Sequence, residues 1–146
     1  MKLKNFPAHV EVRINSEGDI NPIEVNPLRF GGWCTTADLT WHAFGFNSYE
    51  YFIMGKKPNW EHIYKSIENK KYNIIVLDNN SGIKGSEVKY FDYDNLLKDF
   101  SQPLTLRKVD FNKFPLFGFL FAETKIGDDA EINYILNSDL RKYIRV

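Results

Sequence analysis

A short stretch near the start of the chain alternates apolar and polar residues strictly enough to specify a β-hairpin. In residues 9–15, one face of the predicted strand carries Val10, Val12 and Ile14, and the other carries His9, Glu11, Arg13 and Asn15. Residues 16–19, Ser-Glu-Gly-Asp, are typical of a hairpin turn. A second strand is predicted over residues 20–26, and it ends at Pro27 because proline has no N–H for the ladder.

The expected pairing of these strands brings two glutamates together. With a turn of four residues, paired positions sum to 35, so Glu11 lies opposite Glu24 on the polar face. Two carboxylates paired across strands repel each other, and a bound divalent cation would offset that repulsion. Asn26 adds a neutral oxygen on the same face, and such hard oxygen ligands suit Mg²⁺ or Mn²⁺.

A second interpretation of the same residues stays open. Glu11 and Glu24 could belong to the solvated face of an edge hairpin, with nearby arginines forming salt bridges to them. A slip of one residue in the register would also separate the two glutamates. In the empty site we expect an arginine to fold between the carboxylates, and we expect it to be Arg13, two residues from Glu11, rather than Arg29. His9, on the same face, is a candidate substrate contact.

The two strands carry a motif that resembles a known family. Residues 11–13, a turn, and residues 22–32, Pro-Ile-Glu-Val-Asn-Pro-Leu-Arg-Phe-Gly-Gly, resemble the C-terminal magnesium-binding hairpin of ATP-grasp enzymes of the carboxylate-amine ligase type. The spacing of 13 residues between the first acidic residue and the glutamate, and the asparagine two residues later, are similar to the family pattern. The resemblance covers about residues 6–56, including the helix expected after Trp33.

This resemblance implies a set of roles. Glu11 would hold one Mg²⁺ ion, Glu24 would bridge two, and Asn26 would complete the second, so that Glu24 and Asn26 also bind the Mg²⁺–ATP cosubstrate. Arg29 would steady the transferred phosphoryl group, with Arg13 as a second candidate; both are catalytic candidates. The implied reaction is phosphoryl transfer from ATP to a small carboxylate, which gives an acyl phosphate for attack by an amine or another nucleophile.

The family also has an earlier lobe, which the residues before Glu11 are too few to form. That lobe carries the adenine-binding hinge, lysines on the nucleotide and a loop over the phosphates. We therefore expect the chain to be the C-terminal part of such a ligase, inactive without the missing N-terminal lobe. The alternative hypothesis is a non-catalytic binding or regulatory module that keeps the hairpin as a scaffold.

The remaining residues predict an α+β fold. Helices are expected over about residues 36–44, 49–54 and 58–67, and a polar segment at 68–71 suggests a boundary. We assign residues 1–68 to the C-terminal part of an ATP-grasp domain and residues 69–146 to a small α+β extension. In the extension we expect strands at 72–77, 88–91, 104–111 and 116–122, a helix from Asp92 or Asp94 to Phe100, and a last helix from Asp128. The Phe-rich run at 117–121 predicts a central strand, with Gly118 allowing close packing.

Composition excludes several other classes of protein. The 146 residues contain 19 basic and 19 acidic side chains, so the net charge of zero gives no support to a nucleic-acid-binding surface. No apolar run is long enough for a membrane span, and the start of the chain lacks the apolar segment of a signal peptide. The single cysteine, Cys34, suits a cytoplasmic protein. A sheet face left exposed by the missing lobe would be apolar, which predicts association of the chain, for example into a homo-oligomer, at high concentration.

Overall fold

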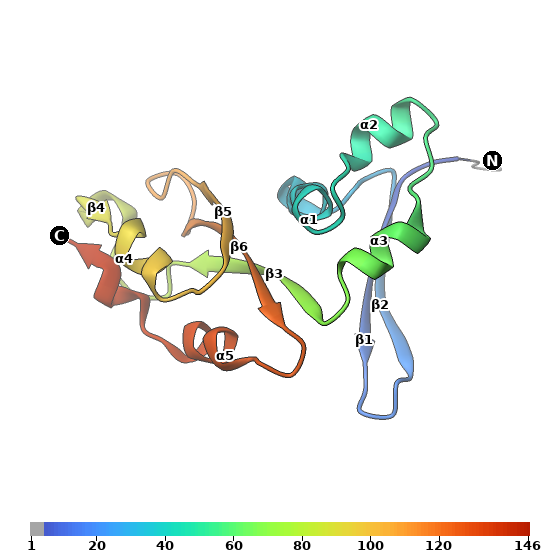
Figure 1. The fold of residues 1–146 in the computed structure, drawn as a ribbon. Helices are drawn as coiled ribbons and strands as arrows, with labels where there is room; N and C mark the ends of the chain where they lie inside the picture. Colours follow the sequence, from blue (N-terminus) through green and yellow to red (C-terminus); the bar gives the residue numbers. More distant parts are fainter. Residues whose placement is uncertain (1–4) are drawn as a thin grey trace. The chain divides into compact units, whose positions relative to one another are not determined.

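The computed structural model describes residues 5–146, and the chain divides into two compact units, Met1–Ile63 and Tyr64–Val146 (Figure 1). Each unit combines helices with antiparallel strands, which confirms the α+β fold class. The boundary that we expected after residue 68 lies inside the second unit, in the short connection between α3 (Trp60–Ser66) and β3 (Lys70–Asp78).

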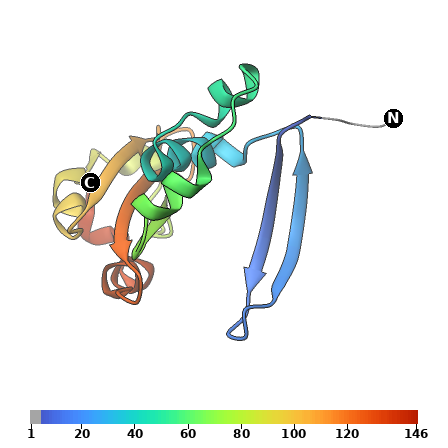
Figure 2. The ribbon, with the colours of Figure 1, turned by 45° about the vertical axis from the view of Figure 1, so that its right-hand side comes forward.

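The first unit begins with a two-stranded antiparallel hairpin, β1 (Ala8–Ile14) and β2 (Ile20–Pro27), which Figure 2 shows as a long ribbon. Its turn is shorter than expected. The backbone N–H of Gly18 donates to the carbonyl of Asn15 at 3.1 Å, and the N–H of Asn15 donates to the carbonyl of Asp19 at 3.2 Å. Gly18 has φ 89°, the left-handed conformation that a three-residue hairpin loop requires.

A β-bulge restores the register that the shorter turn would have shifted. Glu11 pairs with Glu24, but Val12 pairs with Pro22, so Ile23 is the extra residue on β2. The missing N–H of Pro22 is tolerated there because a bulge interrupts the ladder. The bulge also pairs Ile20 with Ile14, so Ile20 joins the apolar face of the hairpin.

Short helices complete the first unit. The single-turn 3₁₀ helix η1 (Gly32–Cys34) leads into α1 (Thr35–Phe44), which ends at Gly45 in the left-handed conformation. The Asn47 side chain caps α2 (Ser48–Ile53) by accepting two backbone N–H groups. The Phe46 ring packs against Tyr51 at 4.7 Å and Trp60 at 5.8 Å between centroids, so aromatic contacts hold these helices together.

The second unit is built on a three-stranded antiparallel sheet with the order β3-β6-β5. The middle strand, β6 (Leu116–Lys125), is buried at nearly every position, which confirms the central strand predicted from its Phe-rich sequence. A Cβ atom on Gly118 would lie 2.6 Å from the carbonyl oxygen of Arg107 in β5 (Pro103–Lys108). The glycine therefore allows the close packing that we expected.

Helices and a second small sheet close the core of this unit. The helix α4 (Tyr93–Lys98) is capped by Asp92, and α5 (Ala130–Asn137) follows Asp129. The short strands β4 (Tyr90–Phe91) and β7 (Ile144–Arg145) pair with each other, and two 3₁₀ helices, η2 (Gly85–Glu87) and η3 (Leu140–Tyr143), lie between the other elements in sequence. The most deeply buried side chains are those of Leu77, Leu96, Phe117, Leu120 and Phe121.

Two expected strands of the second unit are shorter in the structure. The strand predicted over 88–91 is confined to Tyr90–Phe91, and the strand predicted over 104–111 ends at Lys108. The strand that begins at Pro103 is followed by a turn, in which the backbone carbonyl of Asp110 accepts the backbone N–H of Lys113 at 2.9 Å. Among residues 5–146, no helix has the length and apolar character to cross a membrane.

Candidate metal and nucleotide site

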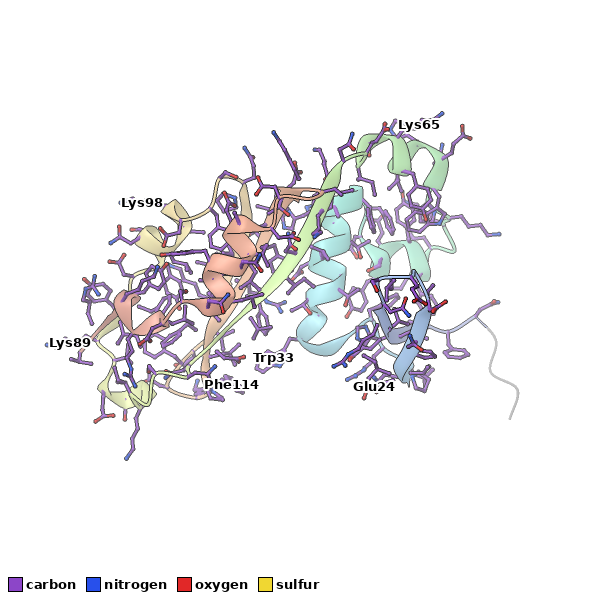
Figure 3. The ribbon with its side chains drawn as sticks, turned by 90° about the horizontal axis from the view of Figure 1, so that it is seen from below. Glu24, Trp33, Lys65, Lys89, Lys98 and Phe114 are labelled. Atoms are coloured by element: carbon purple, nitrogen blue, oxygen red, sulfur yellow. The ribbon has the colours of Figure 1, made fainter. Side chains whose placement is uncertain are left out.

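The polar face of the hairpin brings together side chains from both strands. Glu11 lies directly opposite Glu24, and His9 lies opposite Asn26. Residues paired in this way share a face of the ladder, with Cβ atoms about 4.5–5.5 Å apart. Since His9 and Glu11 are two residues apart on one strand, as are Glu24 and Asn26 on the other, the four side chains form one group. Figure 3 labels Glu24 on this hairpin.

Glu24 is the centre of the contacts in this group. Its Oε1 atom accepts a hydrogen bond from Asn26 Nδ2 and a second from Arg29 Nη2, the latter at 3.3 Å. The Arg29 and Glu24 side chains are each about half exposed, so their ion pair adds at most about 1 kcal/mol to stability. The contact therefore matters for the position of the guanidinium group more than for folding.

Glu11 has a partner of its own. His9 Nε2 lies 3.1 Å from Glu11 Oε1, and the contact becomes an ion pair when the imidazole is protonated. Each of the two glutamates is thus contacted by a basic side chain, which reduces the repulsion that their pairing predicts. Sequence reasoning placed His9 on this face but did not identify its contact with Glu11.

The arginine that pairs with one of the two glutamates is Arg29, which contacts Glu24, whereas we expected Arg13. Arg13 lies beyond the bulge and opposite Asn21, which separates it from the Glu11–Glu24 pair. Arg29 follows a turn at Leu28, where φ is 63° and the backbone N–H donates to the carbonyl of Pro7 at 2.7 Å. β2 ends just before this left-handed residue, and the Arg29 side chain that follows it contacts Glu24.

The residues after Arg29 are fixed against the helices. The Phe30 ring packs edge-on against Tyr49 and Phe52 of α2, with centroids 4.6 and 5.7 Å away. Gly31 has φ 96°, and a Cβ atom there would overlap the Thr36 hydroxyl and lie 3.1 Å from His9 Nδ1. Only glycine therefore allows this segment to pass so close to the polar face of the hairpin.

The side chains on this face carry oxygen atoms of the kind that binds magnesium. Within residues 5–146, no group of three or more His, Cys, Asp and Glu side chains lies close enough to hold a metal ion. Mg²⁺, however, is usually held by one or two carboxylates together with substrate phosphates and water, rather than by a cage of protein ligands. Glu11 and Glu24 are two carboxylates in adjacent positions, and the amide oxygen of Asn26 is a further hard donor.

A second group of polar side chains lies between α1 and α2. The Tyr49 hydroxyl donates to Cys34 Sγ at 3.1 Å, and this hydrogen bond raises the pKa of Tyr49 above its ordinary value. Both residues line a cavity of about 480 Å³ in the first unit. The sequence does not signal this contact between Cys34 and Tyr49, because 15 residues separate the two and only the packing of the helices brings them together.

Comparison with known proteins connects the start of the chain with a known family. Residues 1–37 match the family described as the ATP-grasp domain, a segment that contains both strands of the hairpin together with Glu11, Glu24, Asn26 and Arg29. No curated protein and no solved structure matches the chain.

Proposed function

We propose that this chain, whose residues 1–37 match the ATP-grasp domain, belongs to the ATP-grasp superfamily and that its hairpin is the Mg²⁺–ATP-binding part of a carboxylate-amine ligase. The observation that supports this proposal is the convergence of Asn26 and Arg29 on Glu24, directly opposite Glu11. Two carboxylates, a carboxamide and a guanidinium group on one face are suited to a cation and to the phosphate groups that it binds.

In this proposal Glu11, Glu24 and Asn26 hold Mg²⁺ or Mn²⁺. The bound cation supplies charge neutralisation for the phosphate groups of ATP. Glu11 and Glu24 come from different strands, so the ladder sets their separation, and the bulge at Ile23 keeps them in register. The amide nitrogen of Asn26 donates a hydrogen bond to Glu24, so the amide oxygen of Asn26 is the atom left to bind the cation.

Arg29 is the proposed partner of the transferred phosphoryl group. Its guanidinium contacts Glu24 Oε1, and a cation held by the Glu24 carboxylate would compete with this contact. Arg29 is then available to the phosphate oxygens, to which an arginine can donate two parallel hydrogen bonds. Phe30, packed on α2, limits how far the guanidinium can move away. Arg13, beyond the bulge, is the second candidate for this role.

The proposed reaction is the ATP-dependent activation of a small carboxylate. The carboxylate takes the terminal phosphoryl group of ATP and becomes an acyl phosphate, which an amine or another nucleophile then attacks with release of phosphate. We propose that a further, N-terminal lobe completes the nucleotide site, that residues 1–68 are the C-terminal part of the ATP-grasp domain and that residues 69–146 are an extension of it. The enzyme is proposed to be cytoplasmic, where a lone thiol such as Cys34 stays reduced.

Binding of Mn²⁺–ATP to the full chain tests the metal site. Electron paramagnetic resonance of Mn²⁺, titrated with the chain in the presence of ATP, reports how much of the cation becomes protein-bound. We expect weak binding by the natural sequence, and at least about a tenfold loss in Glu24→Gln and in Glu11→Gln, since each loses a charged ligand. Glu17→Gln is the matched control, because Glu17 lies in the hairpin turn, away from the polar group.

The outcomes separate the parts of the proposal. Equal binding by Glu17→Gln and Glu24→Gln, or no binding by the natural sequence, would overturn the metal site. ATP hydrolysis is expected to stay at background with the chain alone. Turnover by the purified chain that Glu24→Gln abolishes would support the site, but would overturn the need for a second lobe.

A further inference from the structure

A cavity of about 510 Å³ lies within the second unit, and no residue of the proposed metal site lines it. Its walls come from the end of β3, the loop that follows β3, the last turn of α5, and η3. A volume of this size falls in the range of pockets that hold one small molecule. The apolar part of the lining comes from buried or half-buried side chains of the core, namely Ile75, Leu77, Ile135 and Leu140.

The charged residues that line this cavity favour a ligand without net negative charge. They are Asp78, Asp139 and Arg141, so two carboxylates stand against one guanidinium group. The last turn of α5 also lines the cavity, and the carbonyl groups at the end of a helix carry partial negative charge. A phosphate ester or a dicarboxylate would meet this surplus of negative charge, and its binding would be opposed.

Arg141 is held in a fixed position at the cavity. Its Nε atom donates to the backbone carbonyl of Ser81 at 2.7 Å, and Ser81 is only 4% exposed. The loop around Ser81 is fixed in turn, because the Ser81 hydroxyl donates to Asn79 Oδ1 and Asn79 Nδ2 donates to the carbonyl of Ile83 at 2.9 Å. Among residues 5–146, no hydrogen bond involves either Nη atom of Arg141. These two atoms are therefore available to donate in parallel to a carboxylate.

The two aspartates of the lining differ in their contacts. Asp139 Oδ1 accepts the backbone N–H of Arg141 at 2.9 Å, and this hydrogen bond caps η3. The Asp78 side chain is exposed at the end of β3 and has no hydrogen-bond partner within the described residues 5–146. Asp78 is thus the carboxylate of this cavity that is left to accept hydrogen bonds from a cationic group of a ligand.

We propose that this cavity binds a free α-amino acid with an apolar side chain. The carboxylate of the amino acid contacts the Nη atoms of Arg141, its ammonium group contacts Asp78, and its side chain lies against the apolar lining. An amino acid of this kind carries one positive and one negative charge, so it matches both ionic groups without adding net negative charge. The hydrogen bond from Nε explains how Arg141 stabilises the loop, and the site uses only the Nη atoms.

Nuclear magnetic resonance titration of the full chain tests the site. Spectra of ¹⁵N-labelled chain are recorded with L-leucine, L-methionine or L-phenylalanine, without ATP or metal, and we expect saturable shifts of the Asn80 and Ser138 amide signals. Asp78→Asn should weaken binding at least about tenfold, because it removes the charge that pairs with the ammonium group. Asp94→Asn is the matched control, since Asp94 is exposed on α4, outside the cavity lining, and should leave the dissociation constant unchanged.

Arg141→Lys tests the carboxylate contact, because it keeps the positive charge but removes the pair of Nη donors. We expect at least about tenfold weaker binding, whereas Arg145→Lys, outside the cavity lining, should bind normally. Asp78→Asn keeps the test decisive if Arg141→Lys disturbs the loop, since the Asp78 side chain holds no part of the fold together.

The ligand supplies a second, independent comparison. Leucinamide lacks the carboxylate and 4-methylpentanoate lacks the amine, and each should bind at least about tenfold more weakly than leucine. The proposal is overturned if none of the three amino acids gives a saturable shift, if 4-methylpentanoate binds as tightly as leucine, or if Asp78→Asn and Asp94→Asn bind leucine equally. Glu24→Gln should bind leucine normally, so failure of the proposed metal site leaves this result unchanged.

Discussion

Glu11 and Glu24 face each other across the β1–β2 ladder, one position from a bulge that keeps them in register. Two carboxylates in directly opposite positions destabilise a hairpin by about 0.2–1 kcal/mol, unless other charges compensate. His9 and Arg29 contact one carboxylate each, but both contacts are at the surface and offset only part of the repulsion. The arrangement is thus unfavourable for the stability of the empty hairpin, and the proposed cation would relieve the repulsion between the two carboxylates.

Removing one of the two charges should stabilise the first unit when no metal is present. We expect Glu11→Gln to increase the free energy of unfolding by about 0.5 kcal/mol in the presence of a chelator. All three tryptophans, Trp33, Trp41 and Trp60, belong to the first unit, so urea denaturation followed by tryptophan fluorescence reports on this unit alone. Glu17→Gln is the control; a loss of stability in Glu11→Gln would contradict the prediction.

Arg29 should matter little for stability. Arg29→Ala breaks an ion pair whose side chains are 46% and 48% exposed, so the free energy of unfolding should fall by no more than about 1 kcal/mol. The difference should shrink further in high salt, because salt screens exposed charges. Arg13→Ala, measured in the same fluorescence assay, is the comparison. A cost above about 2 kcal/mol for Arg29→Ala would show that the pair is structural, contrary to this expectation.

The hairpin itself could be predicted from the sequence because its information is local. Alternation fixes which side chains share a face, and turn residues mark where the chain reverses. The expected pairing of Glu11 with Glu24 agrees with the structure, but for a different reason: a three-residue loop and a bulge at Ile23 together produce the shift that we assigned to a four-residue turn. Sequence alone does not distinguish a four-residue turn from a three-residue loop with a bulge, because both place Glu11 opposite Glu24.

The contacts that sequence reasoning missed depend on backbone turns or on packing between elements. The choice between Arg13 and Arg29 follows from the left-handed turn at Leu28, a conformation that leucine seldom adopts and that its sequence does not signal. The hydrogen bond between Tyr49 and Cys34 requires α1 and α2 to pack together. By contrast, β6 was predictable as a central strand, because a continuous apolar run needs burial on both faces.

Gly31 should be far more sensitive to substitution than its neighbour Gly32. Gly31→Ala places a Cβ atom on a residue with φ 96°, where it overlaps the Thr36 hydroxyl and approaches His9. Strain in this region costs about 1–3 kcal/mol, so we expect a loss of stability of that size in the fluorescence assay. A Cβ atom on Gly32 meets no atom within 4 Å among the described residues, and Gly32→Ala should change stability by less than about 0.5 kcal/mol. Similar losses in both variants would contradict the structure of this loop.

Tyr143 should make the second unit sensitive to alkaline pH. Its side chain is buried against Phe91, and its hydroxyl donates to Asp99, which Lys142 also contacts at 3.3 Å. Burial first, and the hydrogen bond to the Asp99 carboxylate second, raise the pKa of Tyr143 well above the ordinary value of 10.0. The folded state then holds its proton more tightly than the unfolded state, so this stabilisation is complete below pH 10 and is lost as the pH rises above it.

Tyr143→Phe removes this dependence together with the hydrogen bond. At neutral pH the variant should be about 1–3 kcal/mol less stable, because Asp99 loses a donor and the ring keeps its packing. Above pH 10 the free energy of unfolding of the natural chain should fall by up to about 1.4 kcal/mol more per pH unit than that of the variant, so the two free energies converge. Urea denaturation followed by far-ultraviolet circular dichroism measures the stability of the natural chain and of the variant at each pH. The transition that tryptophan fluorescence also detects is assigned to the first unit, and the remaining transition to the second. Tyr90→Phe removes an exposed hydroxyl and is the control; a constant difference between the natural chain and Tyr143→Phe from pH 8 to pH 11 would contradict the assignment.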